Sequence, residues 1–243
     1  MERPDAIQAQ RGRTADLVPR LDFAPALTAG GPLADRVAEA IAQAASYLRN
    51  CTVPALVELL ADGLHLDTAT RDELTTLIEA PDHVGLLLPS SADRSMIDAA
   101  ATDAGLRISG DTPSRVFSEE LRELAAGQPV STHIYWLHGE HAGARPLCVE
   151  AFVADADIGL MDGWLAAGVG THVALRVRDR AALDRVQVLL AAHADRIPHF
   201  MHGAPMQNAA SGSTVLYYDL PAGAGRGAVR VEMHHMVATA GSA

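Results

Sequence analysis

One order of predicted elements occurs twice in this chain of 243 residues, and it constrains the fold more than any other feature. The first copy is a short apolar strand, a helix and three more strands, expected near 84–88, 95–104, 106–108, 132–137 and 146–153. The second copy repeats that order near 171–177, 181–192, 197–201, 213–219 and 228–236. A recurring order of this kind indicates an internal repeat of one structural unit.

Each copy begins with a histidine and ends on a strand that carries a glutamate. In the first copy these are His83, in Asp82-His-Val-Gly-Leu-Leu-Leu-Pro89, and Glu150. In the second they are His172 and Glu232. Two imidazoles and two carboxylates are a ligand set for a divalent metal ion, so the sequence predicts a repeated metal half-site.

The alternation of side chains along a strand assigns these residues to faces. On the last strand Arg230, Glu232 and His234 share one face and the apolar residues share the other. On the strand that begins the second copy, His172 lies opposite the apolar residues. We therefore expect the histidines and glutamates to lie on the faces opposite the core, next to a polar cavity. The separation is less clean in the first copy, where Glu150 shares a face with Cys148 and Phe152.

The segment before the repeat is expected to be helical. One helix should begin after Pro32, a second should end at Gly63, and a third should span 67–78, where Thr70 and Glu73 have capping-box spacing. The predicted organisation is a mobile lead-in, a helical region, a first module, a connector and a second module, at 1–30, 31–80, 81–153, 154–170 and 171–243.

The formal net charge of −11, without a basic stripe, argues against nucleic-acid and membrane-surface partners and leaves a small-molecule substrate as the expected ligand. Cys51 and Cys148 have no metal-binding or disulfide spacing. The N-terminus lacks the apolar run of a secretory signal, and no apolar stretch has membrane-spanning length. A cytoplasmic location is expected.

The segments 168–179 and 215–223, followed by Val229-Arg-Val-Glu232, resemble the metal-histidine strand and the closing strands of the vicinal oxygen chelate superfamily, which includes glyoxalase I, methylmalonyl-CoA epimerase and extradiol dioxygenases. The resemblance covers about 82–236. It implies an α+β fold in which two βαβββ modules form a half-open β-barrel around a metal site, preceded by the helical N-terminal region. The chain departs from the family in a long loop at 110–130 and an insertion at 224–227.

The resemblance implies that four residues hold one divalent ion (Fe, Ni, Zn, Co or Mn): His83, Glu150, His172 and Glu232. The expected function is isomerase or lyase chemistry through an enediolate, on a small substrate with vicinal oxygens, with Glu150 as ligand or base. One alternative is a non-haem iron(II) dioxygenase that uses only His83, His172 and Glu232. Another is a metal-free ligand-binding or resistance protein of the same fold.

Other polar residues are weaker candidates. Tyr218, or its neighbour Tyr217, is expected to hydrogen-bond a substrate oxygen, and His234 to transfer protons or support a ligand, although strand packing and a surface position are the simpler interpretations. One of His199 and His202 can reach the pocket as an acid or base, and a lid or turn position is at least as plausible for them. A second group is expected to face solvent: His133, His138 and His141. The two units can pair within one chain or between two chains, so a homodimer is possible.

Overall fold

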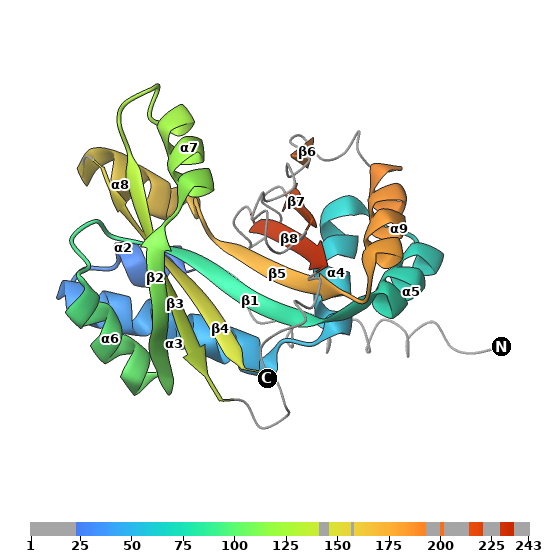
Figure 1. Cartoon of the computed structure of the whole chain (residues 1–243), viewed down its shortest axis with the longest axis horizontal. Coiled ribbons are helices and arrows are strands. Elements are labelled where there is room, and N and C mark those ends of the chain that lie inside the picture. The colour runs from blue at the N-terminus through green and yellow to red at the C-terminus, as the bar shows by residue number, and fades with distance from the viewer. Residues whose placement is uncertain are drawn as a thin grey trace, which may run out of the picture.

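The computed structural model describes residues 23–140, 146–156, 158–192, 200–201, 214–220 and 229–235. Its strands are β1 (Ile78–Leu88), β2 (Leu106–Pro113), β3 (Ser131–Gly139), β4 (Leu147–Asp155), β5 (His172–Val177), β6 (Phe200–Met201), β7 (Thr214–Leu220) and β8 (Val229–His235). They form one eight-stranded sheet in the order β2-β3-β4-β1-β5-β8-β7-β6. In Figure 1 this sheet is curved and open, running from β2 through β1 and β5 to β6.

The two halves of the sheet have the same internal arrangement. β1 pairs in parallel with β4, and β5 pairs in parallel with β8. The other pairs within each half are antiparallel. The halves meet through β1 and β5, which are antiparallel and belong to one chain. This mixed arrangement of helices and strands is consistent with the expected α+β class. The described elements of the second half follow the expected order, and the first half has an additional helix between β2 and β3, at Arg115–Leu124.

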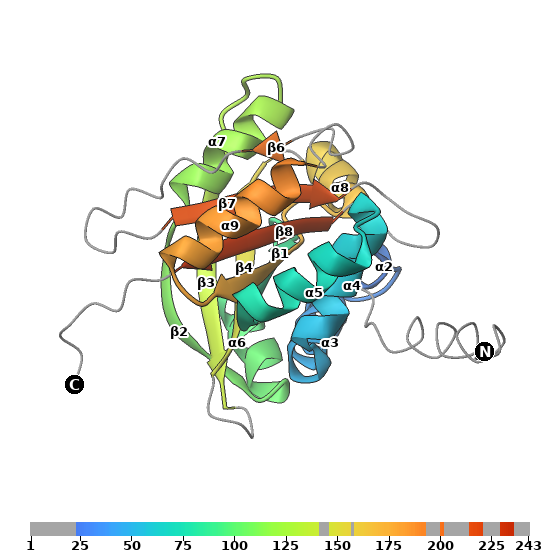
Figure 2. The same ribbon diagram turned by 90° about the vertical axis from the view of Figure 1, so that its right-hand side faces the viewer.

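Several helices cover the sheet face opposite the histidines, and the helix at Arg115–Leu124 lies on the side of the histidines. The described helices are α2 (Ala24–Thr28), α3 (Leu33–Asn50), α4 (Val53–Leu64), α5 (Thr68–Leu77), α6 (Arg94–Asp103), α7 (Arg115–Leu124), α8 (Ile158–Ala167) and α9 (Arg180–Ala191). α3 packs on β1 and β4, α4 on β1 and β7, and α9 on β5 and β8. Figure 2 shows α4, α5 and α9 in front of the sheet. The N-terminal helices thus span both halves.

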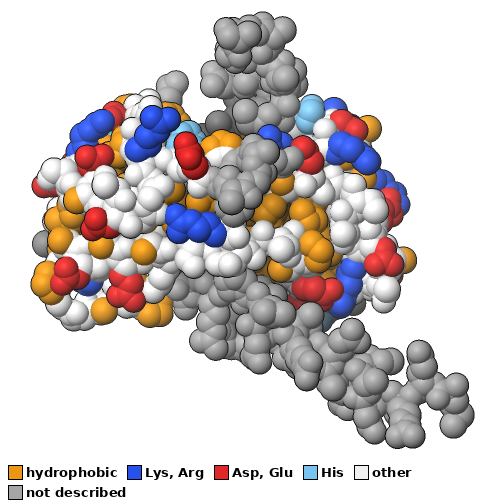
Figure 3. Space-filling model, turned by 90° about the horizontal axis from the view of Figure 1, so that it is seen from below, with side chains coloured by type: hydrophobic (Ala, Val, Ile, Leu, Met, Phe, Trp, Pro, Cys, Tyr) orange, Lys and Arg blue, Asp and Glu red, His pale blue; other side chains and the backbone are white. Residues whose placement is uncertain are grey.

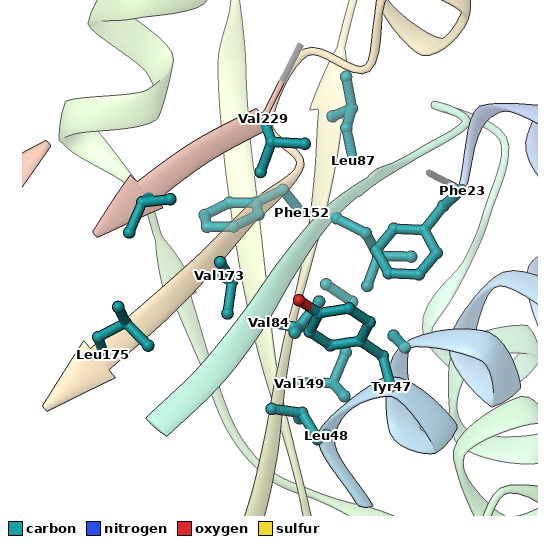
Figure 4. Close-up of a cluster of buried hydrophobic side chains, with 14 of the residues drawn as sticks. Phe23, Tyr47, Leu48, Val84, Leu87, Val149, Phe152, Val173, Leu175 and Val229 are labelled. Atoms are coloured by element: carbon teal, nitrogen blue, oxygen red, sulfur yellow. The ribbon is translucent and has the colours of Figure 1, made fainter. Parts of the chain in front are cut away.

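The core lies between this helical layer and the sheet. Val84, Leu86 and Leu88 on β1 are fully buried and alternate with His83 and Gly85. Figure 4 shows Tyr47 and Leu48 of α3 beside Val84 and Val149. Burying one such Val or Leu side chain contributes about 1.5–3 kcal/mol. This apolar face fixes the strand register. The opposite face carries the histidines and glutamates together with buried apolar side chains such as Leu87 and Phe152.

Side-chain caps begin most of these helices. Asp93 caps α6 by accepting from the Met96 N–H, and Asp179 caps α9 by accepting from the Ala182 N–H. α5 is capped by Asp67, not by the predicted capping box at Thr70. α4 passes through Gly63 and ends only at Leu64, where His65 adopts the left-handed conformation.

Several predicted loops are helical. The expected lead-in 1–30 is packed against the rest of the protein from residue 23 onward, because Phe23 and the following helix α2 contribute buried side chains. Residues 1–22 lie outside the described ranges. The expected loop 110–130 contains the end of β2 and α7, and the connector 154–170 contains α8. β1 begins at Ile78, inside the predicted helical region. The insertion 224–227 lies outside the described residues.

Acidic and basic side chains are interspersed over the described part of the face in Figure 3. Among the helices that the structure describes, none combines the length and the apolar character needed to cross a bilayer.

Candidate metal centre

The four predicted ligands occupy equivalent positions in the two halves. In the first half Gly85, two residues after His83, pairs with Glu150 of β4. In the second half Ala174, two residues after His172, pairs with Glu232 of β8. At the junction of the halves Gly85 pairs with His172. The same register on both sides of the β1–β5 junction brings both histidines and both glutamates to one point.

The side chains converge at this point. The Nε2 atom of His83 lies 3.6 Å from Glu150 Oε2 and 3.9 Å from Glu232 Oε2. The Nε2 atom of His172 lies 3.9 Å from each of the same two oxygens. Ligand atoms of His83, His172 and Glu232 all lie within 4.8 Å of one another, and these three residues are buried. The buried cluster of His83, His172 and Glu232 can hold a metal ion.

Hydrogen bonds on the far side of each imidazole fix its tautomer. His172 Nδ1 donates to the carbonyl oxygen of Gly170 at 3.1 Å, and His83 Nδ1 donates to Asp82 Oδ2 at 3.2 Å. When the imidazole is neutral, as a metal ligand must be, each Nε2 atom then carries a lone pair. Within the described residues neither Nε2 atom has a hydrogen-bond partner, although both are buried. Two buried lone pairs that face two carboxylates are the arrangement that a bound cation satisfies.

Glu150 is oriented by a neighbouring strand. Trp136 of β3 pairs in register with Glu150 and donates its indole N–H to Glu150 Oε1 at 3.2 Å. The second oxygen, Oε2, is the one that approaches the two histidines. Glu150 is also the more exposed of the two glutamates, at 18 % against 11 % for the Glu232 side chain. Its position suits either a fourth ligand or a base that faces a substrate.

Asp82, which binds His83 at Nδ1, also contacts two further polar side chains. Asp82 Oδ2 lies 3.2 Å from His234 Nε2, and Asp82 Oδ1 lies 3.1 Å from Arg176 Nη2. Burial alone would raise the pKa of Asp82, but the hydrogen bonds with His234 and His83 lower it well below its usual range. Asp82 therefore stays ionised and keeps the His83 ring in one orientation.

The cluster also attracts positive charge. Burial opposes protonation of His83, but the charge of Glu150 and the hydrogen bond to Asp82 outweigh it and raise the His83 pKa to about 10. Burial lowers the pKa of His172, and the charge on Glu232 only partly offsets this effect. Without a metal the two carboxylates are thus accompanied by a proton on His83. A divalent ion would take the place of that proton.

Two glycines make room for His172. A Cβ atom added at Gly85 would lie 1.9 Å from His172 Cε1, so the ring crosses β1 where Gly85 has no side chain. Gly170, whose carbonyl accepts from His172, has φ +79°, and a Cβ there would lie 2.6 Å from Phe117 Cζ. Gly85 thus makes room for the ring itself, and Gly170 allows the left-handed backbone conformation and the close approach of Phe117 beside it.

The choice of Tyr218 as a catalytic residue is corrected by the strand register. Tyr218 pairs with Val231 and belongs to the hydrophobic core, whereas Tyr217 pairs with Glu232 and shares its face. Burial and the charge of Glu232 raise the pKa of Tyr217 above its usual value, so its phenol remains a hydrogen-bond donor. Tyr217 is therefore the tyrosine beside the cluster.

The structure places the remaining histidines in different surroundings. His234 is buried, with its ring centroid 5.9 Å from that of His83, and is not a surface residue. His133 binds Asp111 Oδ1 at 3.0 Å, and His138 Nδ1 lies 2.5 Å from Ser109 Oγ, both away from the cluster. Others fall outside the described residues: His141, His199 and His202.

Several residues at the site were not among the predicted candidates. Asp82 directly precedes His83, and Arg230 shares the face of Glu232 by simple alternation, so the sequence does carry a signal for both. Trp136 and Gly85 carry no such signal, because their contacts depend on which strands are neighbours and in what register.

Comparison of the chain with protein families, curated proteins and solved structures found no match in any of the three.

Proposed function

We propose that the chain is a divalent-metal-dependent enzyme of the vicinal oxygen chelate type that acts on a small substrate with adjacent oxygens by isomerase or lyase chemistry. The observation that carries the proposal is the repeated register, in which each histidine lies two residues from the position opposite a glutamate. The strand order of each half, with its first strand beside its last, is what the resemblance in the sequence implies for two such modules.

The residues present fit the metal. His83 and His172 direct buried Nε2 atoms, which have no hydrogen-bond partner among the described residues, at the oxygens of Glu150 and Glu232. A divalent ion bound there would act as a Lewis acid toward two vicinal substrate oxygens and stabilise an enediolate.

The chain's own groups supply the proton chemistry. Glu150 Oε2 faces the cluster while Trp136 holds Oε1, so this carboxylate can take a proton from the carbon beside a substrate carbonyl and return it to a neighbouring atom. The Tyr217 phenol, protonated because its pKa is raised, can donate a hydrogen bond to a substrate oxygen. The apolar face of the sheet excludes water from behind the strands.

One observation favours a second candidate, an iron(II) dioxygenase. His83, His172 and Glu232 form a compact set without Glu150, and two histidines with one carboxylate are the facial triad of non-haem iron oxygenases. In that reaction Glu150 would not be needed as a ligand.

Hydrogen exchange into substrate separates the two candidates. The metal-loaded chain is incubated in D₂O with a panel of 2-oxo acids and 2-hydroxy ketones, and exchange beside the carbonyl is followed by NMR together with oxygen uptake. The enediolate proposal expects exchange without oxygen uptake, and a loss of roughly a hundredfold or more in Glu150→Gln. Glu39→Gln, exposed on α3, is the matched control. Oxygen uptake that Glu150→Gln leaves intact would replace this proposal with the dioxygenase.

A further inference from the structure

Arg230 places a positive charge beside the metal centre. It lies on β8 two residues before Glu232 and pairs in register with His172 of β5. Alternate residues of a strand share a face, so Arg230 projects from the side of the sheet that carries the four ligands. Its side chain is 19 % exposed.

The guanidinium group already holds a carboxylate. Arg230 Nη1 donates to Glu120 Oε2 at 2.8 Å, and the Glu120 side chain is 22 % exposed. Glu120 belongs to α7 in the first half, so this ion pair joins the two halves on the ligand side of the sheet. The Arg230 guanidinium carbon also lies 5.6 Å from the centre of the Tyr217 ring, which restricts its orientation.

We propose that Arg230 is the subsite for a carboxylate of the substrate, and that the carboxylate of Glu120 occupies this subsite when no substrate is bound. The inference rests on the proposed metal function. A planar guanidinium binds carboxylates with two parallel hydrogen bonds, and Glu120 marks the kind of group that it accepts. Arg176, on the same face of β5, is instead bound to Asp82 behind His83.

The position of Arg230 defines a substrate class. A molecule whose adjacent oxygens bind beside the four ligands has Arg230 within reach, because Arg230 lies two residues before Glu232 on β8 and on the same face. The substrate is therefore a 2-oxo or 2-hydroxy acid with a second carboxylate a few bonds from the first. Its binding displaces Glu120 and so loosens the contact between α7 and β8.

Calorimetry on the full chain loaded with zinc tests this subsite with two probes. 2-Oxoglutarate carries the second carboxylate, and 2-oxopentanoate has the same five-carbon chain without it. We expect 2-oxoglutarate to bind at least tenfold more tightly to the unaltered chain, and Arg230→Gln to abolish that difference. Glu120→Gln removes the internal competitor, so it should tighten 2-oxoglutarate binding about tenfold and leave 2-oxopentanoate unchanged.

The controls separate a failure of the Arg230 subsite from a failure of metal binding. Glu73→Gln breaks an exposed pair with Arg185, 2.5 Å apart on other helices, and should change neither probe's affinity. Zinc content is measured first in every variant. A chain that takes up no zinc refutes the metal function itself. A chain that takes up zinc but binds both probes equally, before and after Glu120→Gln, overturns the carboxylate subsite alone, and a gain of affinity in Glu120→Gln cannot come from misfolding.

Discussion

Gly85 allows the two halves to share one site. It pairs in register with both Glu150 and His172, and the His172 ring lies where a Cβ atom at position 85 would be. The equivalent position of the second half is Ala174, which pairs with Glu232, so the two halves differ there by one methyl group.

Gly85→Ala should therefore displace His172 and weaken metal binding at least tenfold, as measured by competition with a chromophoric chelator. The matched control is Gly163→Ala in α8, where a Cβ would meet nothing within 4 Å. That change should leave metal affinity unaltered and raise the free energy of unfolding by about 0.5–1 kcal/mol, because alanine is favoured within a helix. Equal metal affinity in Gly85→Ala and the unaltered chain would contradict the described position of His172.

The reactivity of the Cys51 thiol tests the effect of burial on its pKa. Burial raises the pKa of its thiol to about 12. Since only the thiolate reacts, and the usual pKa is 9.0, the reactive fraction at pH 8 should fall roughly a thousandfold in the folded protein. Labelling with a disulfide reagent should be slow when the chain is folded and fast in denaturant, and Cys51→Ser assigns the signal. Rapid labelling of folded protein at pH 8 would disprove the burial of this thiol.

At the scale of elements, α3 is the main support of the sheet behind the site. Ile41 is fully buried on the apolar face of α3, a helix that packs on β1, β4 and α6. Ile41→Ala should lower the free energy of unfolding by about 2–5 kcal/mol in chemical denaturation. Leu124→Ala, at a position 53 % exposed on α7, should change it by less than about 0.5 kcal/mol. A small effect at Ile41 would mean that the N-terminal helices are not part of the core.

The two helices that were not predicted, α7 and α8, do have local signals in the sequence. Ser114 caps α7, and Phe117 and Leu121 are buried one helical turn apart, but the glycines around them favoured a loop. In α8 Met161, Trp164 and Leu165 have helical spacing, yet Gly163 suggested a connector. The choice between Tyr217 and Tyr218 was different in kind, because two adjacent strand residues can be assigned to faces only when the paired strand is known.

At the scale of the whole molecule, a duplicated arrangement places one site at the junction of its halves. Each half contributes one histidine from its first strand and one glutamate from its last. Because β1 and β5 are antiparallel neighbours, the equivalent residues face each other across the junction. Neither half alone supplies both His83 and His172, so the site depends on the pairing of both.

The sequence predicted these four residues because a repeat leaves a regular signature in residue type and spacing. It could not predict the contacts that side chains around the site make across strand pairs and between the halves. Trp136 reaches Glu150 across a strand pair, and Arg230 reaches Glu120 of the other half. Such contacts depend on tertiary register, which composition and periodicity do not specify.

Elemental analysis of the full chain tests the central claim most directly. The chain is purified under nitrogen without chelator or nickel affinity, beside a His172→Ala, Glu232→Ala double variant, and folding of both is checked by circular dichroism. We expect one divalent ion per chain in the unaltered protein and its loss in the double variant. Iron would favour the dioxygenase, and nickel, cobalt, zinc or manganese the isomerase or lyase. A folded chain that neither retains nor takes up metal, or a double variant that binds as much, would contradict the account and leave a metal-free ligand-binding protein.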